Sequence, residues 1–189
     1  FAKFLKKKVI KKNDNILDVA TGNGRDAFYF CKYANFVFGI DNSKIAIKFN
    51  KRKIRLKKIN NLNFSNLSAE KISLFKKKNI NLIYARFFLH AIKENIEDKF
   101  LLKIKKHFCK STKVALEFRT TKDDLFKKGR KISKNERVTS HYRRFIDLEK
   151  FKRKIKKLKF KIIYKKTGKN LSKTNSENPY LCRLILVSL

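Results

Sequence analysis

The sequence contains no methionine and no tryptophan, and it has only three cysteines and one proline. Cys31, Cys109 and Cys182 lie far apart in the chain, so they match no metal-binding spacing, and an odd number cannot all form disulfides. We therefore expect no bound metal and a reducing compartment, the cytoplasm. Because the chain begins at Phe1 and holds no methionine, we also expect a fragment that lacks its natural N-terminus.

Long apolar runs are absent as well. No segment approaches the roughly 18 apolar residues that a membrane span needs, and no signal-peptide pattern opens the chain. Hydrophobic residues nevertheless make up 42% of the sequence, with 18 phenylalanines, which argues against disorder. A chain of 189 residues can bury a substantial core, and no linker or repeat interrupts it. We expect one domain over residues 1–189.

Acidic residues are scarce: 15 stand against 51 basic ones, for a net charge of +36. Such a charge raises the question of a nucleic-acid partner. However, 40 of the 51 basic residues are lysines spread through nearly every segment, beside abundant Asn, Ile and Phe. An AT-rich coding sequence imposes this mixture, and we favour that explanation over an evolved polyanion surface. No interleaved aromatic and basic strand motif for RNA stacking occurs, so we expect any RNA binding to be non-specific.

The most informative stretch is residues 15–24. A short apolar run at 16–19, typical of a buried strand, ends abruptly in Thr21-Gly22-Asn23-Gly24. A helical pattern follows at once, with apolar residues at i, i+3, i+4 and i+7: Ala27, Phe30, Cys31 and Ala34. Strand, glycine turn and helix form a unit in which a ligand can lie against bare backbone and the N–H groups of a helix start.

A second apolar run at 36–40 ends in Asp41. A carboxylate at the tip of a neighbouring strand can accept hydrogen bonds from both hydroxyls of a ribose. The two runs together predict a nucleoside-binding βαβ unit. The dinucleotide pattern Gly-x-Gly-x-x-Gly is not satisfied, because Ala27 stands at its last position.

The residues Leu17-Asp18-Val19-Ala20-Thr21-Gly22-Asn23-Gly24 instead resemble motif I of the class I S-adenosylmethionine-dependent methyltransferases, acid-x-Gly-x-Gly-x-Gly. Ala20 replaces the first glycine, which we interpret as tolerated although its methyl group narrows the slot for the methionine part. The resemblance implies S-adenosyl-L-methionine as cofactor. It also implies a set of cofactor-binding positions: Asp18, Ala20, Thr21, Gly22, Asn23, Gly24, Asp41, Asn42, Ser68, Ala69, Ala85 and Arg86.

The rest of the chain continues the same alternation. Further strands are expected at 62–64, 80–84, 114–118, 160–164 and 180–187, with helices between them and a polar loop over 120–140. In the helix after the Asn42-Ser43 cap, Ile45, Ala46 and Phe49 are expected to face the core. Five strand–helix units followed by two strands match a Rossmann-like α/β fold: a seven-stranded, mostly parallel sheet with a C-terminal antiparallel hairpin and helices on both faces.

Within this superfamily, residues 22–26 (Gly-Asn-Gly-Arg-Asp) and 86–90 (Arg-Phe-Phe-Leu-His) resemble the tellurite-resistance-type and related small-molecule methyltransferases. Such relatives carry a further segment before the position of Phe1 that helps to cover the cofactor. Where the family holds the adenine with an acid and a small residue, this chain has Ser68 and Ala69, so we expect a weaker hydrogen bond there.

Candidate catalytic residues are Arg86, His90 and His141. Arg86 and His90 follow the fourth expected strand, at the edge where open α/β sheets bind ligands. His90 is a candidate for taking a proton from the acceptor; a purely structural hydrogen bond is the alternative. Arginine is scarce in this lysine-rich chain, so Arg86 suggests a bidentate contact that lysine cannot make, with an ordinary salt bridge as the alternative.

The same reasoning selects Arg119, Arg143 and Arg144 as substrate-binding residues, together with Tyr142. Glu117 is expected to position Arg119 or to accept a proton. We expect the four arginines to converge on one cleft for an oxyanion of the acceptor, although a solvent-facing basic loop remains the alternative.

The sequence therefore predicts a methyltransferase acting on a small anionic molecule. Two other functions stay open: an RNA methyltransferase, favoured by the charge alone, and a catalytically impaired S-adenosylmethionine-binding domain, if Ala20, Ser68 and the missing N-terminus spoil the site. The oligomeric state is not predicted.

Overall fold

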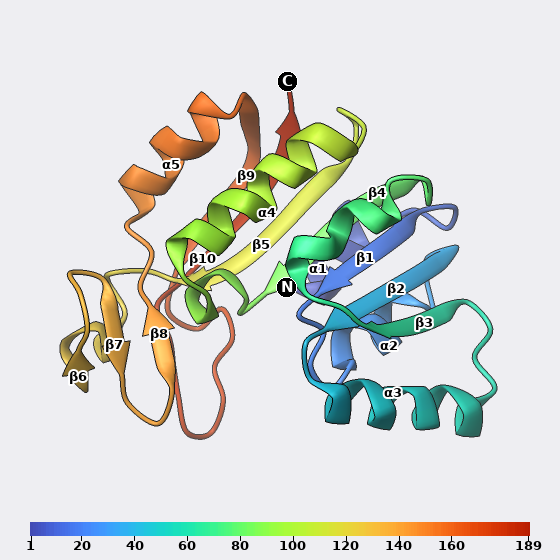
Figure 1. The fold of residues 1–189 in the computed structure, drawn as a ribbon, viewed down its shortest axis with the longest axis horizontal. Coiled ribbons are helices and arrows are strands. Elements are labelled where there is room, and N and C mark those ends of the chain that lie inside the picture. The colour runs from blue at the N-terminus through green and yellow to red at the C-terminus, as the bar shows by residue number, and fades with distance from the viewer.

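The structure, a computed structural model, describes all 189 residues and is built around a seven-stranded sheet in the order β3-β2-β1-β4-β5-β10-β9 (Figure 1). The first five strands pair in parallel, whereas β10 runs antiparallel to both β5 and β9. The strands are β1 (Asn15–Val19), β2 (Phe36–Asp41), β3 (Leu62–Asn66), β4 (Ile80–Arg86), β5 (Lys113–Arg119), β9 (Phe160–Gly168) and β10 (Leu181–Ser188). The predicted Rossmann-like fold and all seven expected strands are confirmed.

Helices cover both faces of this sheet. On one face pack α1 (Ala2–Lys8), α2 (Arg25–Phe30) and α3 (Lys44–Lys57); on the other pack the 3₁₀ helix η1 (Ala69–Phe75), α4 (Glu94–His107) and α5 (Leu148–Lys157). Successive residues Ile16 and Leu17 of β1 are fully buried in opposite cores. A strand covered on both sides needs apolar residues at every position, which is why β1 reads as an unbroken run. No helix of the structure has the length and apolar character of a membrane span.

The inward face of α3 differs from the prediction. Ile45 and Phe49 are exposed, whereas Ile47 and Asn50 are buried. Ser43 caps the helix by accepting a hydrogen bond from the Ala46 N–H at 3.2 Å, which fixes where the helix starts. The inward face then includes a polar residue, Asn50, because its side-chain amide binds the glycine turn beneath it; hydrophobic periodicity alone misses such a position.

The segment 120–140, which the sequence predicts to be a polar loop, contains regular secondary structure. It contains a 3₁₀ helix, η3 (Asp124–Lys127), and two short strands, β6 (Arg130–Lys131) and β7 (Glu136–Val138). These strands join β8 (Tyr142–Arg144) in a small antiparallel sheet. Figure 1 shows this sheet at the lower left, apart from the main sheet, where the connection between β9 and β10 passes close to β8.

Candidate active site

The glycine turn after β1 leaves open space on one side of its backbone. Gly22 and Gly24 both have positive φ, +54° and +74°. A Cβ on Gly24 would lie 2.9 Å from both Asn50 and Phe64, whereas a Cβ on Gly22 would meet nothing within 4 Å. Gly24 is therefore required by packing. Gly22 exposes backbone to a space that a ligand can fill.

Asp41, at the tip of β2, ties this turn to the start of α3. Its Oδ2 accepts a hydrogen bond from the Gly22 N–H at 2.8 Å, and its Oδ1 accepts one from the Ser43 N–H at 2.8 Å. Asn66 holds the strand tip by donating to the carbonyl oxygens of Asp41 and Asn42, at 2.9 Å each. Each carboxylate oxygen has a second lone pair, so Asp41 can still accept from ribose hydroxyls.

The acid of the motif, Asp18, is buried at the end of β1 and accepts a 2.6 Å hydrogen bond from the Thr21 hydroxyl. Burial raises the pKa of Asp18 to about 8, despite the opposing effect of that hydrogen bond. Ala20, where the family has a glycine, lies in the left-handed region with φ +57°. This conformation costs an L-residue roughly 1–2 kcal/mol.

At the end of β4, Arg86 is paired with two acids. Its Nε donates to Glu117 at 2.6 Å and its Nη1 to Asp26 at 3.3 Å. Asp26 belongs to the first turn of α2 and also accepts a 2.8 Å hydrogen bond from the Tyr84 hydroxyl. Arg86 therefore forms salt bridges, which were the expected alternative to a bidentate ligand contact. These salt bridges link β4 to α2, the helix that follows the glycine turn.

Glu117 does not contact Arg119, which corrects the expected pairing. It is fully buried between Arg86 on β4 and Arg183 on β10, its partners in the strand register. Side chains alternate between the two faces of a strand, so Glu117 and Arg119, two residues apart, point to the same face. They nevertheless bind different partners: Glu117 binds Arg86 and Arg183, and Arg119 binds Asp123. Arg86, Glu117 and Arg183 lie side by side on three strands but far apart in the sequence, so no sequence pattern predicts this cluster.

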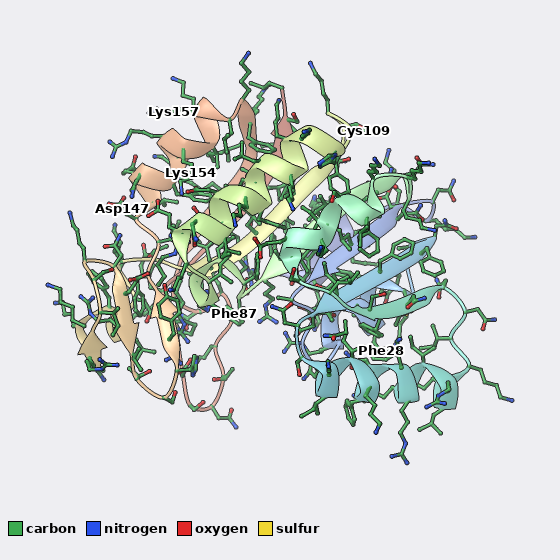
Figure 2. All side chains as sticks on the ribbon, viewed as in Figure 1. Phe28, Phe87, Cys109, Asp147, Lys154 and Lys157 are labelled. Carbon is green, nitrogen blue, oxygen red and sulfur yellow. The ribbon has the colours of Figure 1, made fainter.

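Sequence reasoning also missed Phe87. It has φ +55°, and its ring centroid lies 4.7 Å from the guanidinium carbon of Arg86 and 5.5 Å from the His90 ring. Figure 2 shows it near the centre of the molecule, between the small sheet and β1 to β3. A left-handed conformation at a bulky residue is a genuine outlier, and such strain concentrates at functional sites.

His90 is buried and is not placed to act as a base. Its Nδ1 accepts a 3.2 Å hydrogen bond from the backbone N–H of Arg119. Burial, together with the nearby positive charges of Arg119 and Arg143, lowers the pKa of His90 to about 3. The ring is neutral and its acceptor nitrogen is occupied, so the structural hydrogen bond replaces the expected proton transfer.

The four arginines do not converge on one cleft, contrary to the expectation. Arg119 and Arg143 share a partner: Arg119 donates to Glu177, and Nη2 of Arg143 lies 3.9 Å from the Glu177 carboxylate. Arg119 also binds both carboxylate oxygens of Asp123 at 3.1 Å. Arg86 belongs to the separate cluster described above.

Arg144 points the other way from Arg143, because adjacent residues of β8 face opposite sides. It binds Glu97 of α4 at 2.5 Å and the carbonyl oxygens of Leu89 and Ile92 at 3.2 and 3.0 Å. These contacts fasten the small sheet to the body of the protein.

The other predicted residues differ in burial and in the partners that they contact. The Tyr142 hydroxyl donates to Glu136 at 2.5 Å, and burial raises the pKa of Tyr142. His141 is mostly exposed; the partial loss of solvent around its ring, together with the positive charge of Arg143, lowers its pKa. Ala69 and Ala85 are buried, whereas Asn23 is exposed. Ser68 precedes η1 without capping it.

The carboxyl edge of the sheet therefore carries, in the strand order, Asp41, the glycine turn, Arg86 and Arg119. Residues 10–174 match the family model described as a methyltransferase domain. The chain belongs to the methyltransferase family. The predicted methyltransferase family is confirmed, and solved structures with this fold are described as dependent on S-adenosylmethionine, the cofactor that the resemblance implies.

Solved structures with the same fold support this placement. A methyltransferase from Methanosarcina mazei described as SAM-dependent superposes with a TM-score of 0.82 at 14% identity, over 97% of this chain and 96% of its own. An rRNA methylase from Streptococcus thermophilus reaches 0.62 at 14% identity, over 100% and 93%. TehB from Haemophilus influenzae reaches 0.73 at 11% identity, over 100% of this chain but 61% of its own. No curated protein matches the sequence.

The residues of this methyltransferase fit its cofactor. The open side of Gly22 accommodates a group beside the turn, and Asp41 supplies the acceptor oxygens that a ribose needs. Ala20, in place of the family's glycine, is accommodated by a left-handed backbone conformation with φ +57°.

Proposed function

We propose that this methyltransferase transfers a methyl group to a small molecule that carries an anionic group. The observation that supports this is the meeting of Arg119 and Arg143, with side chains 7% and 8% exposed, at one carboxylate on the carboxyl edge of the sheet. Two nearly buried guanidinium groups at the end of β5, on the same sheet edge as the glycine turn and two strands away from it, are suited to holding an oxyanion in a fixed orientation.

The cofactor-binding roles follow the order of the strand ends. In this proposal Asp41 binds the ribose, and Gly22 to Gly24 and Asp18 lie along the methionine part. Ser68, Ala69 and Ala85 border the adenine. S-adenosylmethionine supplies an activated methyl group together with its leaving group, so the protein has to align the acceptor and exclude water.

The acceptor-binding roles fall to Arg119 and Arg143. An in-line transfer requires a fixed acceptor, and a guanidinium fork orients as well as attracts. His141 precedes Arg143 on the approach to β8; partial burial and the charge of Arg143 lower its pKa, and we assign it the acceptor's proton. The three free cysteines support action in the cytoplasm.

An RNA acceptor is the second candidate. The net charge of +36 favours it, and the rRNA methylase from Streptococcus thermophilus shares the fold. A catalytically impaired cofactor-binding domain is the third, since Ala20 is strained and Ser68 replaces an acid. The small anionic acceptor is preferred because the arginine pair is a localised feature, whereas the lysines are not.

The test combines cofactor binding with transfer. S-adenosylhomocysteine should bind in a calorimetric titration, and Asp41→Ala should weaken it by on the order of tenfold or more through the loss of charge-assisted hydrogen bonds. Radiolabelled cofactor with pooled metabolites should label an anionic compound. Arg143→Lys should reduce this labelling while leaving cofactor affinity unchanged. Labelling of RNA alone would overturn the proposal.

A further inference from the structure

The loop between β9 and β10, residues 169–180, folds across the carboxyl edge and contacts both arginine clusters. Its neck is closed by two hydrogen bonds: the Asn170 N–H donates to Asn178 Oδ1 at 2.8 Å, and Asn178 Nδ2 donates to Asn170 Oδ1 at 2.9 Å. Inside the neck, Ser172 accepts from Arg86 at 3.1 Å and donates to Glu117 at 3.0 Å. The loop is thus anchored over the site by its own side chains.

Glu177 stands on the other arm of this loop. A small turn positions it: the Thr174 N–H donates to the Glu177 carbonyl at 2.8 Å, and the Glu177 N–H donates to the Thr174 hydroxyl at 3.1 Å. Its carboxylate binds Arg119 and approaches Arg143. The Glu177 side chain is 41% exposed, so it is the solvent-facing member of an otherwise buried group.

The four charged side chains Arg119, Arg143, Asp123 and Glu177 have no net charge only while Glu177 contacts the two arginines. Arg119 and Arg143 carry two positive charges, which Asp123 and Glu177 neutralise. Asp123 is buried and held by two N–H groups, those of Leu125 and Tyr180, besides Arg119. If Glu177 leaves, one positive charge remains in a largely desolvated place. A ligand with one negative charge restores the balance, whereas a dianion exceeds it.

We infer that Glu177 occupies the acceptor's anion position as an internal carboxylate. On this view, which rests on the proposed function, the acceptor carries a carboxylate or a similar planar monoanion, and it binds by displacing Glu177 from Arg119 and Arg143. Residues 171–177 move away as a cover when the acceptor enters. Glu177 also excludes weaker anions, since any ligand has to compete with a tethered carboxylate.

Acetate is the probe for this competition. The wild-type protein should bind acetate weakly, and Glu177→Gln should bind it roughly tenfold more tightly, because the competing charge is gone. Glu149→Gln removes the same charge from an exposed ion pair on α5 and should leave acetate affinity unchanged. Adding Arg143→Gln to Glu177→Gln should abolish the gain. Inorganic phosphate at pH 8 should gain less than acetate.

A second measurement needs no variant. In the wild-type protein, saturating acetate should increase hydrogen exchange at the amides of residues 171–177 and leave the amides of α5 unchanged. Equal acetate affinity in wild type and Glu177→Gln would overturn the inference, as would a gain that Glu149→Gln shares or that persists without Arg143. Binding of S-adenosylhomocysteine, measured separately, tests the proposed function, so failure of one is distinguishable from failure of the other.

Discussion

At the scale of single residues, Ala20 is the position where this chain departs from its family most directly. Its φ of +57° lets the glycine turn form at the cost of left-handed strain. Ala20→Gly should therefore raise the free energy of unfolding by roughly 0.5–1 kcal/mol, after allowance for the greater freedom of glycine in the unfolded chain. Urea denaturation measures this. Ala46→Gly, inside α3, should lower it by about 1 kcal/mol; a loss at both positions would contradict the strain argument.

The two glycines of the turn should respond differently to alanine. At Gly24 the new methyl group meets Asn50 and Phe64 at 2.9 Å, so Gly24→Ala should cost roughly 2–3 kcal/mol of stability through strain and overpacking. At Gly22 the methyl group meets no protein atom, so stability should fall by only about 1 kcal/mol. Gly22→Ala should instead weaken binding of S-adenosylhomocysteine. Calorimetric titration beside thermal unfolding separates the two effects.

Asp18 should make stability depend on pH. Its pKa of about 8 lies above the ordinary value of 3.8 because burial disfavours the charged form. Below about pH 4 the carboxyl is protonated in both states; between pH 4 and 8 only the unfolded state releases the proton. Stability is therefore lost as pH rises toward 8.

Asp18→Asn, which keeps an acceptor for Thr21, removes this dependence. The variant should gain stability over wild type between pH 5 and pH 8, by on the order of a few kcal/mol, in urea titrations at both pH values. A constant difference between the two proteins would mean that Asp18 is ionised in the folded state.

At the scale of elements, β8 presents two adjacent arginines to different surroundings. Arg144 neutralises Glu97, whose side chain is 1% exposed. Arg144→Gln should cost on the order of 3 kcal/mol, although Lys154 still contacts Glu97 at 2.7 Å. Arg143→Gln should cost clearly less than Arg144→Gln, since its acidic partner Glu177 is 41% exposed and can turn to solvent. Chemical denaturation of both variants checks this, and equal losses would contradict the assigned orientations.

The elements that the sequence predicts correctly are those with an apolar period. β1, β2, β4, β5 and β10 are largely buried, so their apolar runs identify them, whereas β9 alternates between exposed residues and more buried ones such as Phe160 and Ile162. The small sheet was missed because β6 has two residues and β7 three, all polar or half-exposed. The contact that fastens this sheet to α4 joins Arg144 and Glu97, which lie 47 positions apart.

The site residues that can be predicted are likewise those with a local sequence signal. The glycine turn and Asp41 are local signals and were found. Asn50 and Glu177 were not, because each acts on a partner far away in the chain: Gly22 for Asn50, and Arg119 for Glu177. The arginines were selected by their scarcity, and their roles stay a prediction; which acid each one meets follows from the strand register and not from the sequence pattern.

At the scale of the whole molecule, positive charge remains largely uncompensated. Ten of the 15 acidic residues form salt bridges, and these engage 11 of the 51 basic residues, so 40 basic residues have no acidic partner. Figure 2 shows nitrogen-tipped side chains around the whole outline of the molecule. Mutual repulsion of these charges opposes the compact state.

Added salt should therefore stabilise the fold. Raising NaCl from 20 to 300 mM shortens the Debye length from about 20 Å to about 6 Å, which screens exposed charges from one another. The midpoint of thermal unfolding should rise by several degrees over this range, as measured by circular dichroism. A falling midpoint would mean that the 15 salt bridges contribute more than the repulsion does.

The same unpaired positive charge predicts that RNA binds non-specifically and only at low salt. Lysines spread over all faces neutralise phosphates but read no bases, so several unrelated RNAs should bind with similar affinity at low salt. Each released counterion steepens the salt dependence, and binding of all of them should collapse together between 50 and 200 mM salt, by ~10³-fold or more if six or more phosphates are contacted. Filter binding with a panel of RNAs of equal length tests this. One RNA that stays bound at 200 mM salt and accepts a methyl group would replace the small anionic acceptor with an RNA substrate, because selective binding under screening conditions requires contacts that uniform lysines do not make.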